Sequence, residues 1–239
     1  ANNGTYNVDF ADTGGSLLQK FQVTASSAVG LAGTPHFGWT DLVTGINAAS
    51  YTADWALTAE MWALLPSGTS YISARAWDNA GSSGTLADAF YIRKDTQTVT
   101  ITDNQAGDTV WRSANDGLYN VDASASGASL VDRLEVRSST MPGGAGPFTS
   151  DWTAAVTGIN SASYTADWAL PAAVFDAMLS DATNYISVRV YNQAQNSASL
   201  ADAFFVKKDT VPVVIANNIP GGDQAWRNAS GTTYNLDFS

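Results

Sequence analysis

The sequence predicts an all-β protein built of tandem β-sandwiches, each with about seven strands and a short helix at one strand corner. Three observations lead to this prediction: a repeat along the chain, apolar residues that alternate within short segments, and turn-forming residues between those segments. The 239 residues are enough for two domains of about 110 to 120 residues, each with its own core. Only 14% of the residues are charged, against roughly 25% in an average soluble domain, which is typical of β-rich secreted proteins.

The repeat is visible in an eight-residue segment, SYTADWAL, which occupies residues 50–57 and again residues 163–170. VTGIN and LADAF also occur twice, at similar separations. A third copy begins near the end, because the segment that starts at Tyr6 recurs at Tyr119 and at Tyr234. The 228 residues from Tyr6 to Tyr234 are two periods averaging 114, so the chain is a tandem repeat.

Alternation of apolar and polar residues predicts the strands of each period. In residues 50–57, Tyr51 and Trp55 fall on the apolar face, and in the strand that follows Ile72 and Ala74 do so. Clusters of Gly, Asn, Asp and Ser separate these segments from further strands of the same kind. We expect those strands around residues 86–92, 99–101, 119–121 and 130–136. About seven strands per period is the number that a β-sandwich needs.

One segment in each period has apolar residues at helical spacing instead. It spans residues 58–65 in the first copy and 171–179 in the second. Thr58 and Pro171 stand where a helix would begin. We therefore expect a short helix at the corner between two strands.

The repeat divides the chain into three parts. Residues 1–96 form a sandwich that lacks its first strand, residues 97–210 form a complete repeat, and residues 211–239 carry the first strands of a third repeat. Val213 and Ile215 correspond to the missing strand. Two interpretations stay open: the chain is a slice of a long tandem array, or the tail of one subunit is a donor segment that completes the sandwich of a neighbouring one.

Composition excludes several classes of function. A net charge of -11 argues against a nucleic-acid partner, and the absence of an apolar run of about 18 residues argues against membrane insertion. There is no cysteine, the only histidine is His36 in a predicted exposed loop, and the only glutamates are Glu60 and Glu135. These residues do not make a catalytic triad, a His-rich metal site or a two-carboxylate hydrolase. We expect the protein not to be an enzyme and to carry no cofactor, with calcium as the one possible exception.

The turn motifs resemble those of a known class of repeat. The hairpin Ala76-Trp77-Asp78-Asn79-Ala80-Gly81-Ser82 and the linker Asp209-Thr210-Val211-Pro212-Val213 are similar to turns in the bacterial immunoglobulin-like and fibronectin III-like tandem repeats of large extracellular surface proteins. The resemblance covers essentially the whole chain. It implies immunoglobulin-like sandwiches at the cell surface or outside the cell, without catalysis, in stalks, adhesins, filaments or surface layers.

Acidic residues near the repeat boundaries are candidate calcium ligands, because Ca²⁺ prefers clustered carboxylate, amide and carbonyl oxygens. Ordinary turn and capping roles are the alternative. The candidate carboxylates are Asp78, Asp95, Asp103, Asp108, Asp209 and Asp223, with Asn79, Asn104, Asn192, Asn217 and Asn218 beside them.

A second candidate site is an outward row of aromatic and arginine side chains on two neighbouring strands of each copy. Such residues are enriched at binding hot spots. The alternative is a sheet face whose aromatic and arginine side chains stack only on one another and bind no partner. In the first copy the row is Tyr71, Arg75, Trp77, Tyr91 and Arg93; in the second it is Tyr185, Arg189, Tyr191 and Phe205.

The sequence leaves two functions open. The first is a structural repeat module of an extracellular filament, stalk or giant surface protein, whose partners are copies of itself or adjacent repeats. The second is an adhesin or carbohydrate-binding module that uses the aromatic and arginine row to hold surface glycans.

Overall fold

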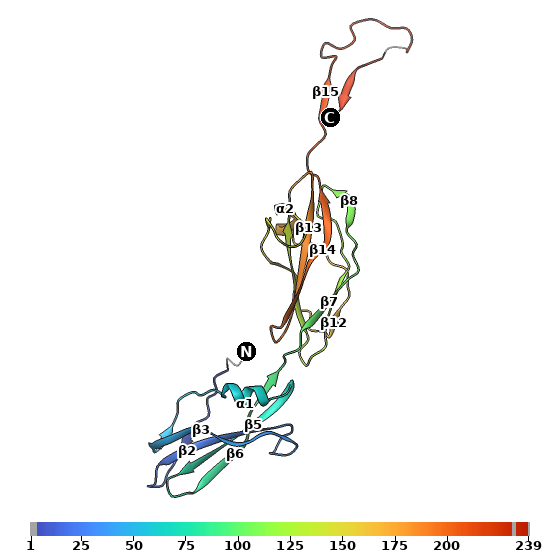
Figure 1. Cartoon of the computed structure of the whole chain (residues 1–239). Coiled ribbons are helices and arrows are strands. Elements are labelled where there is room, and N and C mark those ends of the chain that lie inside the picture. Colours follow the sequence, from blue (N-terminus) through green and yellow to red (C-terminus); the bar gives the residue numbers. More distant parts are fainter. Residues whose placement is uncertain (1–3, 231–232, 239) are drawn as a thin grey trace.

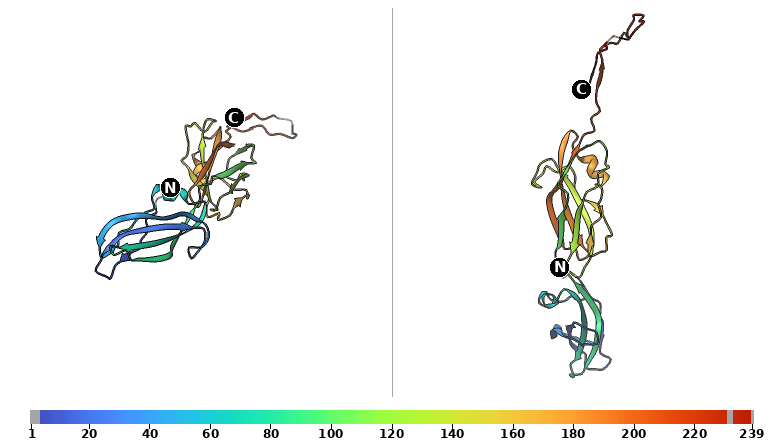
Figure 2. Two further views of the ribbon diagram at one scale, coloured as in Figure 1. Left: turned by 60° about the horizontal axis from the view of Figure 1, so that its bottom comes forward. Right: turned by 90° about the vertical axis from the view of Figure 1, so that its right-hand side faces the viewer.

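Two β-sandwiches and a C-terminal hairpin make up the protein (Figure 1), whose computed structural model describes residues 4–230 and 233–238. The two sandwiches follow one another end to end, and the hairpin lies beyond the second (Figure 2). Each sandwich has its own apolar core. The predicted all-β sandwich fold, with one short helix per copy, is confirmed.

The second sandwich has a five-stranded and a three-stranded sheet. The order is β11-β10-β13-β14-β8 in the larger sheet and β12-β9-β7 in the smaller. Its strands are β7 (Val99–Asp103), β8 (Asp108–Arg112), β9 (Val121–Ala125), β10 (Val131–Ser139), β11 (Thr153–Val156), β12 (Ser163–Tyr164), β13 (Ala182–Asn192) and β14 (Ser197–Lys208). All pairs are antiparallel except β8 with β14, which run parallel.

The first sandwich is smaller. Its sheets have the orders β3-β2-β5-β6 and β1-β4. The strands are β1 (Phe10–Ala11), β2 (Leu18–Ser26), β3 (Pro35–Ala48), β4 (Ser50–Tyr51), β5 (Gly68–Asp78) and β6 (Ser83–Lys94). Among the described residues of this sandwich, no strand takes the places that β7 and β8 take in the second, so both of its sheets have an open edge.

The duplicated SYTADWAL segment places a tryptophan in each core. Trp55 is 5% exposed and Trp168 is 4% exposed. Each exchanges main-chain hydrogen bonds with a tyrosine of the opposite segment, Trp55 with Tyr6 and Trp168 with Tyr119. These pairs extend the smaller sheet of each sandwich, and the tyrosine rings stack on a phenylalanine of the last strand, which belongs to the facing sheet.

Both predicted helices are present at a strand corner. In the first sandwich, α1 (Ala59–Leu64) begins at Thr58, whose hydroxyl accepts a hydrogen bond from the main-chain N–H of Met61 at 3.2 Å. In the second, α2 (Ala172–Ala177) begins at Pro171. Neither helix, nor any other helix in residues 4–230 and 233–238, is long and apolar enough to cross a bilayer.

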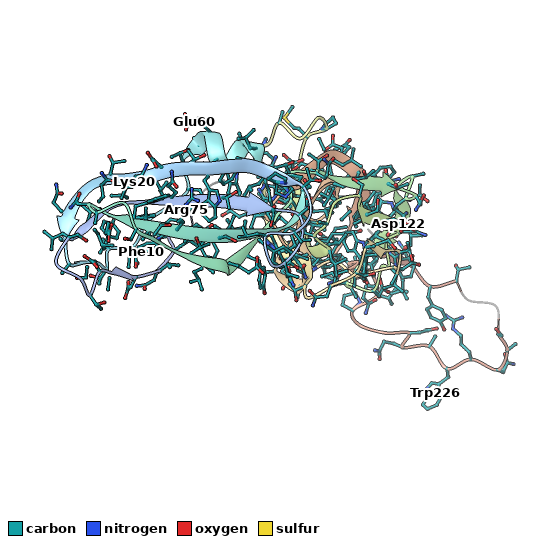
Figure 3. All side chains as sticks on the ribbon, turned by 90° about the horizontal axis from the view of Figure 1, so that it is seen from below. Phe10, Lys20, Glu60, Arg75, Asp122 and Trp226 are labelled. Atoms are coloured by element: carbon teal, nitrogen blue, oxygen red, sulfur yellow. The ribbon has the colours of Figure 1, made fainter. Side chains whose placement is uncertain are left out.

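The C-terminal hairpin pairs β15 (Ile215–Asn217) with β16 (Leu236–Phe238). All residues of both strands are exposed. Trp226, in the segment between the strands, lies away from both sandwiches (Figure 3) and is fully exposed.

Candidate functional site

An aromatic and arginine face covers the outer side of the β3-β2-β5 sheet in the first sandwich. The guanidinium carbon of Arg75 lies 4.4 Å from the ring centroid of Trp39 and 5.1 Å from that of Trp77. Gln22 links Arg75 to Trp77, because its side-chain oxygen accepts hydrogen bonds from Arg75 at 2.6 Å and from the Trp77 indole N–H at 3.1 Å. Arg75 is therefore held between two aromatic rings in a fixed orientation.

The same face is more open toward the β6 edge. Tyr71 and Tyr91 lie opposite each other on β5 and β6, and Arg93 lies 5.5 Å from the Tyr91 ring. Tyr91 is 57% exposed. The residues of the predicted row in the first copy thus share one face, with Arg75 and Trp77 packed together and Tyr91 and Arg93 in solvent.

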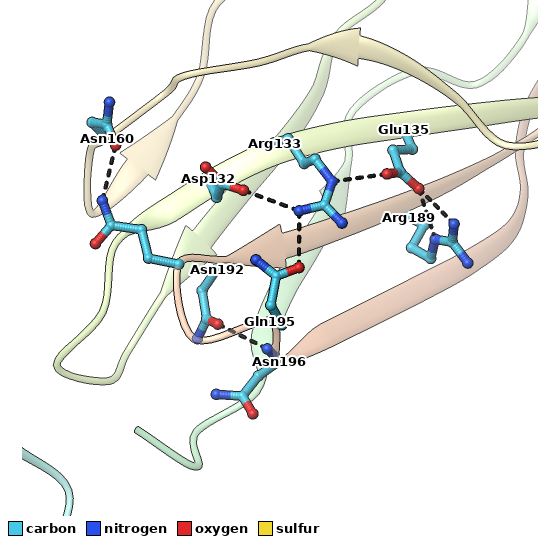
Figure 4. A network of polar contacts seen from close by, with 9 residues as sticks. Asp132, Arg133, Glu135, Asn160, Arg189, Asn192, Gln195 and Asn196 are labelled. Atoms are coloured by element: carbon cyan, nitrogen blue, oxygen red, sulfur yellow. Dashed lines mark hydrogen bonds and ion pairs between the residues drawn. The ribbon is translucent and has the colours of Figure 1, made fainter. Parts of the chain in front are cut away.

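The second sandwich carries a denser version of this arrangement. Arg189 lies 4.4 Å from the Trp152 centroid and 5.0 Å from that of Tyr191, and Arg133 lies 3.9 Å from the Tyr191 centroid. Glu135 accepts hydrogen bonds from both arginines, at 2.8 Å from Arg133 and 2.5 Å from Arg189 (Figure 4). The two cations are therefore neutralised in part by one carboxylate on β10.

Glu135 is only partly exposed, and this sets its pKa. Burial alone would raise the pKa of the carboxyl group, but the hydrogen bonds and charges of Arg133 and Arg189 outweigh it. The net result is a pKa below the ordinary value, so Glu135 is ionised at neutral pH.

Tyr185 and Phe205 form a separate aromatic pair at the other end of the same strands. They lie opposite each other on β13 and β14. A side chain at Gly107 would collide with the Phe205 ring, so the loop that leads into β8 rests against this ring. Phe205 is therefore partly covered within the sandwich, unlike its counterpart Tyr91.

Sequence reasoning missed several members of the face. Trp39 lies on β3 and Trp152 directly before β11, and the row of alternating residues included neither strand. Gln22 and Glu135 hold the arginines from neighbouring strands. A signal for the tryptophans was available, because both precede a VTGIN segment by a few residues, one in each copy.

The candidate calcium ligands do not converge. The β5–β6 hairpin separates two of these candidates: Asp78 is at its turn and Asp95 follows its open end. Asp103 and Asp209 accept hydrogen bonds from main-chain N–H groups two residues ahead. In the described part of the chain, no three His, Cys, Asp or Glu residues come close enough to hold a metal ion.

Two other candidate acids, Asp108 and Asp223, are held by arginine. Asp108 accepts a hydrogen bond from Arg112 at 2.5 Å and Asp223 from Arg227 at 2.6 Å. Each also accepts from a tyrosine hydroxyl. These aspartates act as structural acceptors, and calcium binding by either stays a prediction.

Asp95 has a defined role at the junction of the sandwiches. Its carboxylate accepts hydrogen bonds from the Gln97 N–H at 2.8 Å, from the Ser129 N–H at 2.8 Å and from the Ser129 hydroxyl at 2.5 Å. Asn196 donates to the Asp95 carbonyl oxygen at 3.0 Å. Burial would raise the pKa of Asp95, but these hydrogen bonds lower it overall. The linker is therefore fastened to the second sandwich by one ionised side chain.

A cleft of about 460 Å³ opens beside this linker. It is lined from the first sandwich by Gly68, Thr69 and Arg93, and from the second by Ser129 and Gln193 among others. The two sandwiches therefore face each other across the linker.

The Gly, Thr and Pro neighbours of His36 predicted an exposed loop, and this prediction was wrong. His36 is in β3 and half-buried. Its Nε2 atom is buried, with no hydrogen-bond partner in the described residues. The strand extends further toward the N-terminus than expected because Pro35 pairs with Ser26.

Solved structures similar to this chain include the following two. One is described as Clostridium thermocellum CbhA fibronectin(III)-like modules, with 14% identity over 86% of this chain and 88% of that one, and a TM-score of 0.36. The other is described as a tetra-tandem repeat in the extending region of a large adhesion protein, with 14% identity over 90% of this chain and 48% of that one, and a TM-score of 0.33. No family model matches the sequence, and no curated protein matches it either.

Proposed function

We propose that this chain is a structural repeat module of an extracellular filament, stalk or giant surface protein, in which sandwiches follow one another in an array. Its role is to hold distance and to bear tension, not to catalyse. The internal repeat, the separate core of each sandwich and the hydrogen-bonded linker between them all support this proposal.

The parallel pairing of β8 with β14 is the observation on which the proposal chiefly depends. Val206 lies opposite Asp108 and Lys208 opposite Arg112. β8 is near the start of the repeat and β14 is its last strand, so tension along the array pulls them in opposite directions along their length. The hydrogen bonds between such strands are loaded together in shear, whereas strands peeled from one end lose their bonds one at a time.

The linker chemistry supports transmission of that tension from one sandwich to the next. Asp95 binds the first residues of the second sandwich and also Ser129, which lies between β9 and β10. Asp209 accepts the equivalent main-chain bond from Val211 at 2.8 Å after the second sandwich. Each repeat thus ends in an aspartate whose carboxylate accepts a hydrogen bond from the main chain of the segment that follows.

Force spectroscopy on single molecules tests the proposal. The second sandwich, which has the β8–β14 pair, should unfold as one sharp event that lengthens the chain by about 350 Å, from 114 residues per period at roughly 3.3 to 3.6 Å each less the folded length. Electron microscopy of the native material should show a fibre with a repeat of about 40 Å, the length of a 12-residue strand such as β14. Unfolding at forces too small to measure, or compact particles, would contradict the proposal.

A second candidate function is binding of glycans or a neighbouring chain by the aromatic and arginine face. The stacked Arg75 and Arg189, one in each sandwich, favour it because they would give two equivalent sites on one molecule. Glycan-array binding that is lost in Trp77→Ala and Tyr191→Ala, and kept in Leu64→Ala, would support it. Leu64 is a suitable control because it is 57% exposed and lies on α1, away from the sheet face.

A further inference from the structure

Cations and aromatic rings alternate in one series on the large sheet of the second sandwich. The guanidinium carbon of Arg137, on β10, lies 3.7 Å from the ring centroid of Phe148 and 4.6 Å from that of Trp152. Arg189 lies 4.4 Å from the same Trp152 centroid, which joins these residues to the arginine and tyrosine contacts described above. We call the series the ladder; its members in order of contact are Phe148, Arg137, Trp152, Arg189, Tyr191 and Arg133.

Arg137 is the cation of the ladder that has no carboxylate beside it. Arg133 and Arg189 share Glu135 (Figure 4), and Arg133 also forms an ion pair with Asp132 at 3.0 Å. Within the described part of the chain, Arg137 makes neither a hydrogen bond nor an ion pair, and its Nε atom is buried without an acceptor. Polar groups of this kind are rare because they destabilise a fold. The hydrogen-bonding capacity of the Arg137 guanidinium is therefore unused by the chain itself.

The first sandwich has no counterpart of this arrangement. When the two copies are aligned at an offset of 113 residues, the separation of the two VTGIN segments, Thr24 takes the position of Arg137 and Pro35 that of Phe148. Thr24 is buried, and its hydroxyl donates a hydrogen bond to the carbonyl oxygen of Phe37 at 2.7 Å. The unpaired cation and its exposed ring are thus specific to the second copy, and the fold does not need them.

An acidic sugar fits this end of the ladder. A guanidinium binds a carboxylate through two parallel hydrogen bonds. The ring of Phe148 is 43% exposed, and the negative face of an aromatic ring attracts the C–H groups of a sugar ring. A phosphate ion or an acidic side chain would use Arg137 but leave Phe148 uncovered, whereas a sugar acid uses both.

We propose that Arg137 and Phe148 bind an acidic polysaccharide. Arg137 holds the carboxylate of a uronic acid unit, Phe148 contacts the C–H face of its ring, and Trp152 fixes the guanidinium between them. The net charge of -11 repels a polyanion only weakly, because salt screens such repulsion beyond about 8 Å at physiological ionic strength. This inference rests on the second candidate function, glycan binding by the aromatic and arginine face, and narrows it to one class of sugar and to one site per chain.

Isothermal titration calorimetry of the intact chain with a short oligomer of galacturonic acid tests the inference. Binding should saturate at one site per chain, because Thr24 and Pro35 replace the two binding residues in the first sandwich. The fully methyl-esterified oligomer has the same sugar rings without the charges, so it should bind at least about tenfold more weakly. This comparison uses the unaltered chain and does not depend on how any variant folds.

Substitutions of Arg137 assign the site. Arg137→Thr introduces the residue of the first copy and should weaken binding of the acid at least about tenfold, whereas Arg137→Lys keeps the charge without the fork and should fall between. Lys207→Thr is the matched control, because it removes one positive charge from the same sheet at its β8 edge. Its affinity should stay within about twofold of the unaltered chain. Urea unfolding of each variant shows whether it is folded.

Four results would overturn the inference: no binding of the acid, equal binding of the acid and its ester, equal binding of poly-aspartate of matched length, or unchanged affinity in folded Arg137→Thr. Binding of neutral glycans by both sandwiches would also overturn it, but would uphold the second candidate function. The force measurements test the structural role separately from all of these.

Discussion

Lys208 donates a hydrogen bond from its side-chain amine to the carbonyl oxygen of Phe175, 2.9 Å away, although Lys208 is only 7% exposed. The same amine lies 3.1 Å from the carbonyl oxygens of Asp176 and Met178, so it satisfies the C-terminal end of α2. Lys94 has the same role at the end of α1. In each sandwich a lysine of the last strand thus holds the corner helix against the sheet.

Replacing Lys208 by methionine should destabilise the second sandwich. Lys208→Met keeps the apolar stem but leaves the carbonyl oxygens of α2 without their donor, which we expect to lower the free energy of unfolding by about 1 to 3 kcal/mol. Denaturant unfolding measures this change. Lys207→Met is the matched control, because the Lys207 amine lies over the exposed Trp111 ring and should contribute less than about 1 kcal/mol. Equal losses in the two variants would contradict the assigned role.

Stability should fall in acid because of Glu135. Its pKa is lower in the folded protein than the ordinary value of 4.5, so the unfolded chain takes up the proton first as the pH falls. The ion pairs with Arg133 and Arg189 therefore stabilise fully above about pH 4.5 and are lost as the pH falls through the folded pKa. Glu135→Gln should reduce the difference between urea midpoints at about pH 7 and about pH 3.5. Asp176→Asn, on the exposed side of α2, should leave that difference as it is.

The two tryptophans of the second sandwich should differ in their contribution to stability. Trp168 lies in the core, and Trp168→Ala should lower the free energy of unfolding by about 3 to 5 kcal/mol. Trp152 lies on the sheet face against Arg137 and Arg189, and Trp152→Ala should cost about 1 kcal/mol. Thermal unfolding of both variants measures the difference. A larger loss for Trp152→Ala would show that the face, and not the core, holds the layers together.

Removal of Asp95 should loosen the junction. Asp95→Ala deletes the acceptor of Gln97 and Ser129, so small-angle X-ray scattering should give a broader distribution of distances between the sandwiches. Proteolysis at residues 93–97 should become several-fold faster. Asp209→Ala is the control. It deletes the equivalent turn hydrogen bond from Val211, but among the described residues Asp209 has no counterpart of the Asp95–Ser129 contact. An unchanged scattering curve for Asp95→Ala would mean that other contacts hold the junction.

The repeat made the fold predictable. Duplicated segments aligned Trp55 with Trp168, and both are core residues because each lies at the same alternating position in its copy. The corner helices were predictable from local signals, the Thr58 cap and Pro171. Both features depend on residues close together in the sequence, where periodicity and capping rules apply.

The contacts between distant segments were not predictable in the same way. Lys208 looks like a surface residue of a strand, and its burial depends on α2, some 30 residues earlier. The stacking of Arg75 on Trp39 depends on which strands are neighbours, and alternation along one strand carries no such information. The separation of the two calcium candidates Asp78 and Asp95 was not predictable for a related reason: they are near in the sequence, but a long hairpin carries them to opposite ends of the sandwich.

The pairing of β8 with β14 also constrains how the protein is made. Asp108 and Val206 are 98 residues apart (206 less 108), so a ribosome takes about 5 to 20 seconds to add β14 after β8 has emerged. During that interval β7, β8 and β9 have neither the last strand nor most of the core to pack on. The β15–β16 hairpin pairs in the register of β7 with β9 although all residues of its two strands are exposed, so pairing of this kind can precede the core during synthesis.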